Sequence, residues 1–211
     1  EDTLAFLRQA WTSNDRFTFD SDYWTLKDVL IEPKPVQLPH PPMWVGAASE
    51  ASIRKAAAGG LRLFLDQVST FDEVKHRLAI YRAAQRHAGI PAHPYDVALT
   101  RPLLLAADGE ERQQLLESHL GTLEYLADST SNSADNPFYS APQQRRERVE
   151  RSAIIGAPTE CIERLQHLQD MGIYQVLFTR TSPALLARFA AQVMPGFRSS
   201  ATSQQSPTAL P

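Results

Sequence analysis

The chain has very little cysteine, since Cys161 is the only one among its 211 residues. A single cysteine excludes an internal disulfide framework and fits a reducing compartment such as the cytoplasm. Long apolar runs are also missing, because no stretch approaches the roughly 18 residues of a membrane span, and no signal peptide is visible. We therefore expect a cytoplasmic protein that has no membrane partner.

An excess of either charge is missing as well. The chain has 21 lysine and arginine residues against 24 aspartate and glutamate residues, a net charge of -3, with no basic stripe interleaved with aromatic residues. This balance argues against nucleic acid as a partner. No spacing of histidine, cysteine and carboxylate residues suggests a metal site. The expected partner is a small molecule.

The most informative segment that is present is Pro33–Gln67, PKPVQLPHPPMWVGAASEASIRKAAAGGLRLFLDQ. A proline-rich lead-in precedes a short apolar strand, a turn of small residues, a helix and a second buried strand. Ser49 suits the N-cap of that helix. Unpaired N–H groups and the dipole at a helix N-terminus attract an anion, and small residues let its oxygens approach the backbone. The candidate phosphate-binding residues are Gly46, Ala47, Ala48, Ser49 and Ser52.

Two observations weigh against a phosphate at this turn. The turn is not a GxGxxG pattern and lacks the lysine of a P-loop. Glu50 would repel a phosphate unless its side chain turned outward. The residues alone are therefore also consistent with a capped helix that binds no ligand.

Strands and helices alternate along the rest of the chain. Buried strand patterns cover Leu61–Leu65, Val97–Ala106 and Tyr174–Thr179, and Thr70 with Glu73 forms a capping box. Strands separated by helices in this way imply an α/β fold with a parallel sheet. Four such strands are half of a (β/α)8 barrel, which typically needs about 250 residues. The chain is either a small open sheet or one half of a barrel.

Two segments are expected to lack regular structure. Asp128–Gln144 is rich in serine, asparagine, aspartate and proline, and a loop of this length in a compact domain is usually functional or disordered. We expect residues 128–144 to form a mobile loop near the substrate. The tail 199–211 is low in apolar residues and is expected to be disordered. Residues 1–198 then form the folded part.

Two blocks of the sequence resemble the bacterial luciferase-like flavin monooxygenase family. The first block contains an F-x-F element at Phe17–Trp24, a P-x-P-x-Q-x-P-H-P-P run at Pro33–Trp44 and the small-residue turn. The second block, Ile155–Ile162, is similar to the family's G-T-P-x-E-C-I element before the last strand. The resemblance covers roughly Glu1 to Arg198. Each block is weak alone, and their order and spacing make the combination specific.

The resemblance implies a TIM-barrel flavoprotein of which this chain holds about the C-terminal four βα units. Such proteins take reduced FMN, supplied by a separate flavin reductase, and use O2 to oxidise a small organic substrate. The FMN phosphate would contact Ala48, Ser49 and Ser52, with Gly46 and Ala47 lining the approach. Ala48 stands where luciferase has an acidic residue, so its contact would come from the backbone. Family members commonly form homo-oligomers.

The ends of the next strands, Asp66–Gln67 and Thr100–Arg101, are expected to line the pocket at the same catalytic face. An ion pair with a neighbouring carboxylate is the expected role of Arg101. The family's first four strands carry the histidine, cysteine and arginine groups around the flavin, so no catalytic residue can be assigned in this chain. Structural, exposed or loop positions are expected for the other candidates, which are His40, His76, His87, His93, His119, His167 and a buried Cys161.

Two other interpretations stay open beside the FMN-dependent monooxygenase. One is a truncated, non-catalytic barrel half that pairs with another chain, since a half barrel leaves strand edges and an inner face uncovered. The other is a deazaflavin (coenzyme F420) dehydrogenase, which shares the barrel and the phosphate turn. The chain starts at Glu1 within an expected helix, which predicts further sequence upstream. We expect this part alone to be inactive.

Overall fold

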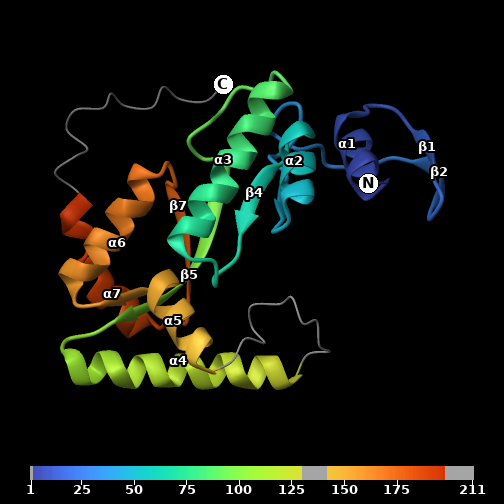
Figure 1. Cartoon of the computed structure of the whole chain (residues 1–211). Coiled ribbons are helices and arrows are strands. Elements are labelled where there is room, and N and C mark those ends of the chain that lie inside the picture. The colour runs from blue at the N-terminus through green and yellow to red at the C-terminus, as the bar shows by residue number, and fades with distance from the viewer. Residues whose placement is uncertain (1, 130–141, 198–211) are drawn as a thin grey trace. The chain divides into compact units, whose positions relative to one another are not determined.

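A computed structural model describes residues 2–129 and 142–197 (Figure 1). The chain divides into two compact units, Glu1–Met43 and Trp44–Pro211. Among the described residues, no helix combines the length and the apolar character needed to cross a membrane.

The first unit is a helix with a β-hairpin. Helix α1 (Asp2–Thr12) precedes strands β1 (Phe17–Asp20) and β2 (Thr25–Val29), which pair antiparallel. The rings of Phe6 and Phe19 lie with their centroids 5.4 Å apart, so α1 packs on the hairpin. The sequence did not predict this hairpin, because its strands are short and mostly exposed and lack a strong apolar alternation.

The proline-rich segment of the first unit folds back on α1. Lys34 Nζ donates a hydrogen bond to the carbonyl oxygen of Ala10, at 3.3 Å. The His40 ring lies 6.0 Å from the Trp11 ring, and its Nδ1 lies 2.8 Å from the carbonyl oxygen of Pro41. The predicted structural role of His40 is therefore confirmed.

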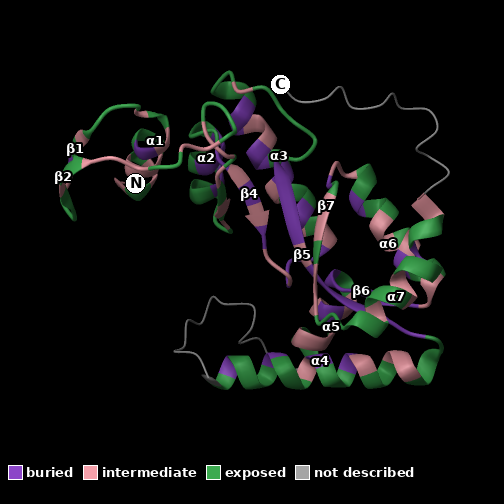
Figure 2. Ribbon diagram, turned by 180° about the vertical axis from the view of Figure 1, so that it is seen from behind, coloured by how far each residue is buried: buried purple, intermediate pink, exposed green. Residues whose placement is uncertain are grey.

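The second unit is built on a parallel sheet. Its strands are β3 (Trp44–Gly46), β4 (Arg62–Leu65), β5 (Val97–Leu105), β6 (Ile154–Gly156) and β7 (Gln175–Thr179). Strand β5 pairs with β4, β6 and β7, and β3 pairs with β4, all in parallel. Figure 2 shows that β5 is buried over most of its length. The predicted parallel sheet is confirmed.

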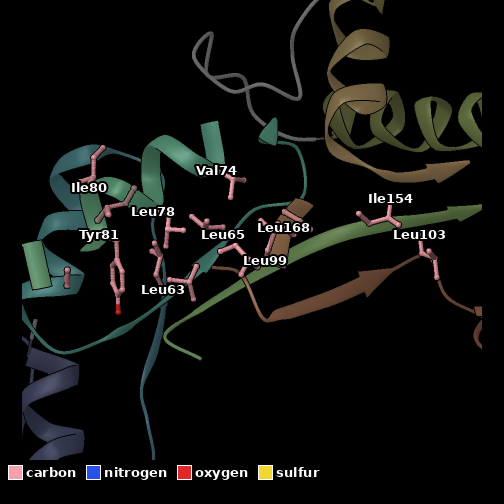
Figure 3. Close-up of a cluster of buried hydrophobic side chains, with 14 of the residues drawn as sticks. Leu63, Leu65, Val74, Leu78, Ile80, Tyr81, Leu99, Leu103, Ile154 and Leu168 are labelled. Atoms are coloured by element: carbon pink, nitrogen blue, oxygen red, sulfur yellow. The ribbon is translucent and has the colours of Figure 1, made fainter. Parts of the chain in front are cut away.

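Among the described residues, four helices cover one face of this sheet. They are α2 (Glu50–Ala58), α3 (Phe71–His87), α6 (Pro158–Asp170) and α7 (Pro183–Gln192). Side chains alternate between the two faces along each strand, so Leu63, Leu65 and Leu99 point together into the main core, where each is 0% exposed. Figure 3 shows these leucines beside side chains of α3. We call this side the covered face.

The other side, which we call the open face, carries Phe64, Thr100 and Leu177 on alternate positions of the same strands. Leu177 is 47% exposed there. Within the described residues, the open face is covered where β5 runs on to pair with β6. In that region Leu104 packs with side chains of α4 (Gly109–Ser129) and α5 (Pro142–Ser152) in a second core cluster.

The expected helix ends agree with the structure at several caps. Thr70 Oγ1 accepts from the Glu73 N–H at 3.3 Å, and the Glu73 carboxylate accepts from the Thr70 N–H at 2.6 Å, as a capping box requires. Helix α4 continues to Ser129 and α5 begins at Pro142, so both ends of the predicted loop 128–144 are helical. The predicted loop 128–144 falls mostly outside the described residues, and the predicted tail 199–211 falls entirely outside them.

Candidate functional site

The small-residue turn lies between β3 and α2, at the carboxyl end of a strand on the sheet edge. Ser49 is the N-cap of α2, with φ -78° and ψ 150°, and its Oγ accepts from the Ser52 N–H at 3.2 Å. The next two N–H groups of the helix, those of Glu50 and Ala51, make no hydrogen bond with any described residue. These unpaired donors at an exposed helix N-terminus are available to an anion.

The two serine hydroxyls of the turn are bonded to each other. Ser52 Oγ donates to the Ser49 carbonyl oxygen at 2.9 Å, and the two hydroxyl oxygens lie 2.8 Å apart. A hydroxyl has one hydrogen, so the hydrogen between the two oxygens comes from Ser49. A bound anion would have to compete with these internal bonds to use either hydroxyl.

Glu50 is directed away from the mouth of the turn. Its carboxylate accepts from Arg54 Nε at 3.0 Å and from Arg54 Nη2 at 2.6 Å, four residues along the exposed surface of α2. The turning outward that phosphate binding requires is therefore present. This i,i+4 pair also balances the negative charge of the carboxylate next to the helix N-terminus.

The small residues of the turn have different surroundings. Ala47 packs against the main core, whereas Gly46, Ala48 and Ser49 are accessible at the surface. A Cβ atom on Gly46 would approach only the Phe64 carbonyl oxygen, at 4.0 Å, which is ordinary contact. Gly46 is therefore not required by close packing within the described residues, and space above it remains open to a ligand.

Arg101 differs from its predicted role. It lies within β5 with 0% of its surface exposed, and it makes no ion pair with any described residue. Its Nη1 donates to the Asp66 carbonyl oxygen at 2.8 Å and its Nη2 to the Ser69 carbonyl oxygen at 2.6 Å. Burial lowers the pKa of Arg101 to about 10, although the Asp66 carboxylate acts in the opposite direction. The predicted ion pair was wrong, because the sequence cannot show that the loop after β4 turns its carbonyl groups toward β5.

Asp66 organises the same loop from within. Its carboxylate accepts from the N–H groups of Val68, at 2.9 Å, and Ser69, at 2.7 Å, and it pairs with Arg77 of α3 at 2.6 Å. Burial acts to raise the pKa of Asp66, but the Ser69 hydroxyl and these other donors outweigh it and hold the pKa below its ordinary value. Asp66 thus holds the loop after β4 in place.

Gln67, the next residue, reaches across the open face. Its Oε1 accepts from the Thr179 hydroxyl at 3.2 Å, and Thr179 ends β7 on the far side of β5. The sequence named Asp66, Gln67, Thr100 and Arg101 as pocket-lining residues at strand ends and missed Thr179. Of these, Arg101 is fully buried on the covered face, and Thr100 lies within β5, which runs on to Leu105. The signal that could have found Thr179 is its place at the end of the last strand.

His119 of α4 is a buried titratable group. It is 3% exposed, its Nδ1 has no hydrogen-bond partner among the described residues, and it shares a face of α4 with Leu116 and Leu123. Burial lowers the pKa of His119 to about 4, and the nearby Arg180 acts in the same direction. The side chain is therefore neutral at pH 7, and its packing role agrees with the sequence.

Cys161 is also buried, as predicted. Its thiol is 3.5 Å from the Gly156 carbonyl oxygen, and burial raises its pKa to about 11. A thiol with this pKa is not a nucleophile at neutral pH. No group of three metal-binding side chains is found in the described part of the chain.

Comparison with known proteins identifies relatives of the chain. The sequence profile of a family described as luciferase-like monooxygenase matches residues 1–175. The oxygenase component of the flavin-dependent trigonelline monooxygenase of Acinetobacter baylyi is 23% identical over 229 residues. That alignment covers 96% of this chain and 61% of the relative, so the chain spans about three fifths of the relative's length.

Solved structures share the fold at low identity. The monooxygenase RslO1 from Streptomyces bottropensis superposes with a TM-score of 0.74 at 22% identity, over 93% of this chain and 60% of RslO1. An F420-dependent secondary alcohol dehydrogenase gives a TM-score of 0.72 at 16% identity, over 93% of this chain and 60% of that enzyme. These likenesses confirm the predicted fold, about four βα units of a luciferase-like TIM barrel.

Proposed function

The chain belongs to the luciferase-like monooxygenase family, and we propose that it acts in an enzyme that uses reduced FMN and O2 to oxidise a small organic substrate. The observation that carries this proposal is the exposed helix N-terminus at Ser49, with two unpaired N–H groups at the carboxyl end of a parallel strand. Ligands of α/β proteins bind at this end of the strands.

The residues of the turn fit a phosphate group. The N–H groups of Glu50 and Ala51 would donate to its oxygens, and the hydroxyls of Ser49 and Ser52 would join them after exchanging their mutual bond for bonds to the ligand. Glu50 stays paired with Arg54 and leaves the anion unopposed. Bound flavin supplies the electrons that activate O2, while these residues bind and orient its phosphate.

A separate flavin reductase is the expected partner. The trigonelline relative is named as an oxygenase component, which supports a two-component system in which another protein delivers the reduced flavin. In the described residues the turn opens at the surface of the sheet edge, as a site that exchanges its flavin with a second protein requires. Turnover should then require a second protein that supplies the reduced flavin.

The test compares FMN with riboflavin, which lacks the phosphate. In the protein expressed from its complete reading frame, Ser49→Ala should weaken FMN by on the order of tenfold and leave riboflavin within about twofold, because a charge-assisted hydrogen bond contributes about 1.5–3 kcal/mol. Fluorescence titration measures both affinities. Ser182→Ala is the matched control, since Ser182 caps α7 in the same way, accepting from the Leu185 N–H at 3.2 Å. Equal losses of FMN and riboflavin would refute the phosphate assignment.

Coenzyme F420 is the second candidate cofactor. The F420-dependent alcohol dehydrogenase shares the fold of this chain, and F420 also carries a phosphate that the turn could hold. Titration with both cofactors separates the candidates, because a monooxygenase binds FMN and consumes O2 whereas an F420 dehydrogenase does neither. A protein that binds neither cofactor would favour the third candidate, a non-catalytic barrel half that serves as a subunit.

A further inference from the structure

A cleft of about 390 Å³ lies between three helices of the second unit. It is lined by the first turn of α3, the last turn of α5 and the middle of α6, and both α3 and α6 lie on the covered face of the sheet. Small-molecule sites typically have volumes of roughly 300–1,000 Å³, so this space suits a small ligand. We call it the helix cleft.

The apolar wall of the helix cleft is aromatic. Phe71 packs against the main core, and the His167 ring stands edge-on to it, with the ring centroids 5.5 Å apart and the planes at 81°. The buried Arg101 guanidinium lies 5.8 Å from the centroid of the same Phe71 ring. Phe71 is therefore held by contacts with both residues and presents a fixed apolar surface to the cleft.

The charged side chains that α3 and α5 bring to the helix cleft are neutralised in pairs. Arg151 Nη2 donates to the Asp72 carboxylate at 3.0 Å. The Glu150 carboxylate lies 3.7 Å from Nη1 of Arg112. The charges that remain in the cleft therefore come from α6.

These are Glu163 and Arg164, and both have unused polar atoms. The exposed Glu163 carboxylate has no ion pair or hydrogen bond within the described part of the chain. Arg164 Nη1 donates to the carbonyl oxygens of Glu150 and Ala153, at 2.9 and 3.0 Å. Its Nε and Nη2 have no partner among the described residues, and neither atom is buried. Consecutive helix residues point about 100° apart, so the carboxylate and the guanidinium stand on different sides of the cleft that they both line.

The free edge of Arg164 is the edge that suits a carboxylate. Nε and Nη2 of a guanidinium carry parallel N–H groups that match the two oxygens of a carboxylate. Arg54 uses the same edge in this protein, since its Nε and Nη2 donate to the Glu50 carboxylate at 3.0 and 2.6 Å. A ligand carboxylate in the helix cleft would therefore complete the hydrogen bonding of Arg164.

We propose that the helix cleft binds a small zwitterion, an α-amino acid with an apolar side chain. Its carboxylate lies against Nε and Nη2 of Arg164, its ammonium group pairs with Glu163, and its side chain packs on Phe71. A cleft with one free charge of each sign favours a ligand that also carries one charge of each sign, because any other ligand leaves a charge without a partner. The proposal goes beyond the proposed function and does not depend on a flavin at Ser49.

The test uses L-phenylalanine as the probe and isothermal titration calorimetry as the measurement. Phenethylamine keeps the ring and the ammonium group of this probe, and hydrocinnamate keeps the ring and the carboxylate. In the protein from its complete reading frame, each of these two ligands should bind at least about tenfold more weakly than L-phenylalanine, because each loses one charge-assisted contact.

Substitutions on α6 separate the two ends of the ligand. Glu163→Gln should weaken L-phenylalanine about three- to tenfold and leave hydrocinnamate, which has no ammonium group, within about twofold. Asp170→Asn is the matched control, because it removes a carboxylate from the same helix outside the cleft, and it should change the affinity by less than about twofold. Arg164→Lys keeps the positive charge but loses the paired N–H groups, so it should weaken both carboxylate ligands and leave phenethylamine unchanged.

Several results would overturn the proposal. One is the absence of L-phenylalanine binding at concentrations up to about 10 mM. Another is phenethylamine or hydrocinnamate binding as tightly as L-phenylalanine, and a third is an equal effect of Glu163→Gln and Asp170→Asn. The comparison of the three ligands uses the unmodified protein, so it decides even where a variant fails to fold. The phosphate assignment is tested separately, by Ser49→Ala with FMN and riboflavin, and can fail without affecting the helix cleft.

Discussion

The two faces of the parallel sheet differ sharply although they share the same strands. Leu63, Leu65 and Leu99 on the covered face are completely buried under helices, whereas Leu177 on the open face is 47% exposed. Among the described residues, α4 and α5 pack on the open face around Leu104. The covered face supplies the stability of the fold, and the open face carries the groups that a ligand can reach.

Adjacent residues of β5 show the same contrast for polar groups. Arg101 points to the covered side, is fully buried and uses its guanidinium to hold the backbone after β4. Thr100, one residue earlier, points to the open side and is half-buried. A one-residue step along a strand therefore separates a structural group from a candidate binding group.

The largest expected effect is a difference in stability between two substitutions, one on each face of the sheet. Leu99→Ala should lower the free energy of unfolding by about 2–5 kcal/mol, because it leaves a cavity in the main core. Leu177→Ala should lower it by about 1 kcal/mol or less, since half of that side chain is exposed. Urea denaturation of the chain measures both. A loss at Leu177 as large as that at Leu99 would show that another segment or chain covers the open face.

A second pair of substitutions tests whether the buried Arg101 guanidinium stabilises the fold. Arg101→Met should lower the free energy of unfolding by about 2–3 kcal/mol, because the carbonyl oxygens of Asp66 and Ser69 lose their donors in a buried place. Arg54→Met on the exposed surface of α2 should cost less than about 1 kcal/mol, as expected for a surface ion pair. Thermal and urea unfolding both report the difference. Similar small losses at the two sites would contradict a structural role for Arg101.

The smallest expected effect is a pH dependence of stability caused by His119 of α4, the helix that packs on the open face. Folding lowers the pKa of His119 to about 4 from its ordinary 6.5, so between these values the unfolded chain binds a proton that the folded chain does not. Stability should therefore fall with decreasing pH, by about 1 kcal/mol between pH 7 and pH 5.5.

His119→Leu should remove this pH-dependent loss, and urea unfolding at the two pH values measures it. His76→Leu is the control, since His76 is exposed on α3. A loss of stability that persists unchanged in His119→Leu would show that other groups cause it.

Much of the second unit could be predicted from the sequence, because its strands are apolar runs and its helices carry recognisable caps. Thr70, Ser49 and Ser182 cap their helices through local contacts only three residues long, which a sequence displays directly. The elements that escaped prediction are the hairpin at Phe17–Val29 and the helix α5, which are mostly polar or exposed, and the buried strand β6, which is only three residues long.

The candidate site was predictable only in part. The turn around Ser49 is a local motif, so both its position and its cap could be recognised from neighbouring residues. The bond between Gln67 and Thr179 joins residues 112 positions apart and depends on the pairing of two strands with β5. The contacts of Arg101 also join distant segments, which is why its partners were predicted incorrectly.

The hydrogen bonds from Arg101 to the loop after β4 restrict the motion of that loop. One guanidinium joins two carbonyl groups that lie 35 and 32 residues earlier in the chain, so this loop cannot swing away unless β5 releases it. Local opening of the loop therefore costs these two buried hydrogen bonds, which makes such opening rare. The loop beside Gln67 is therefore expected to stay in place when a ligand enters, and any movement that admits the ligand has to come from other segments.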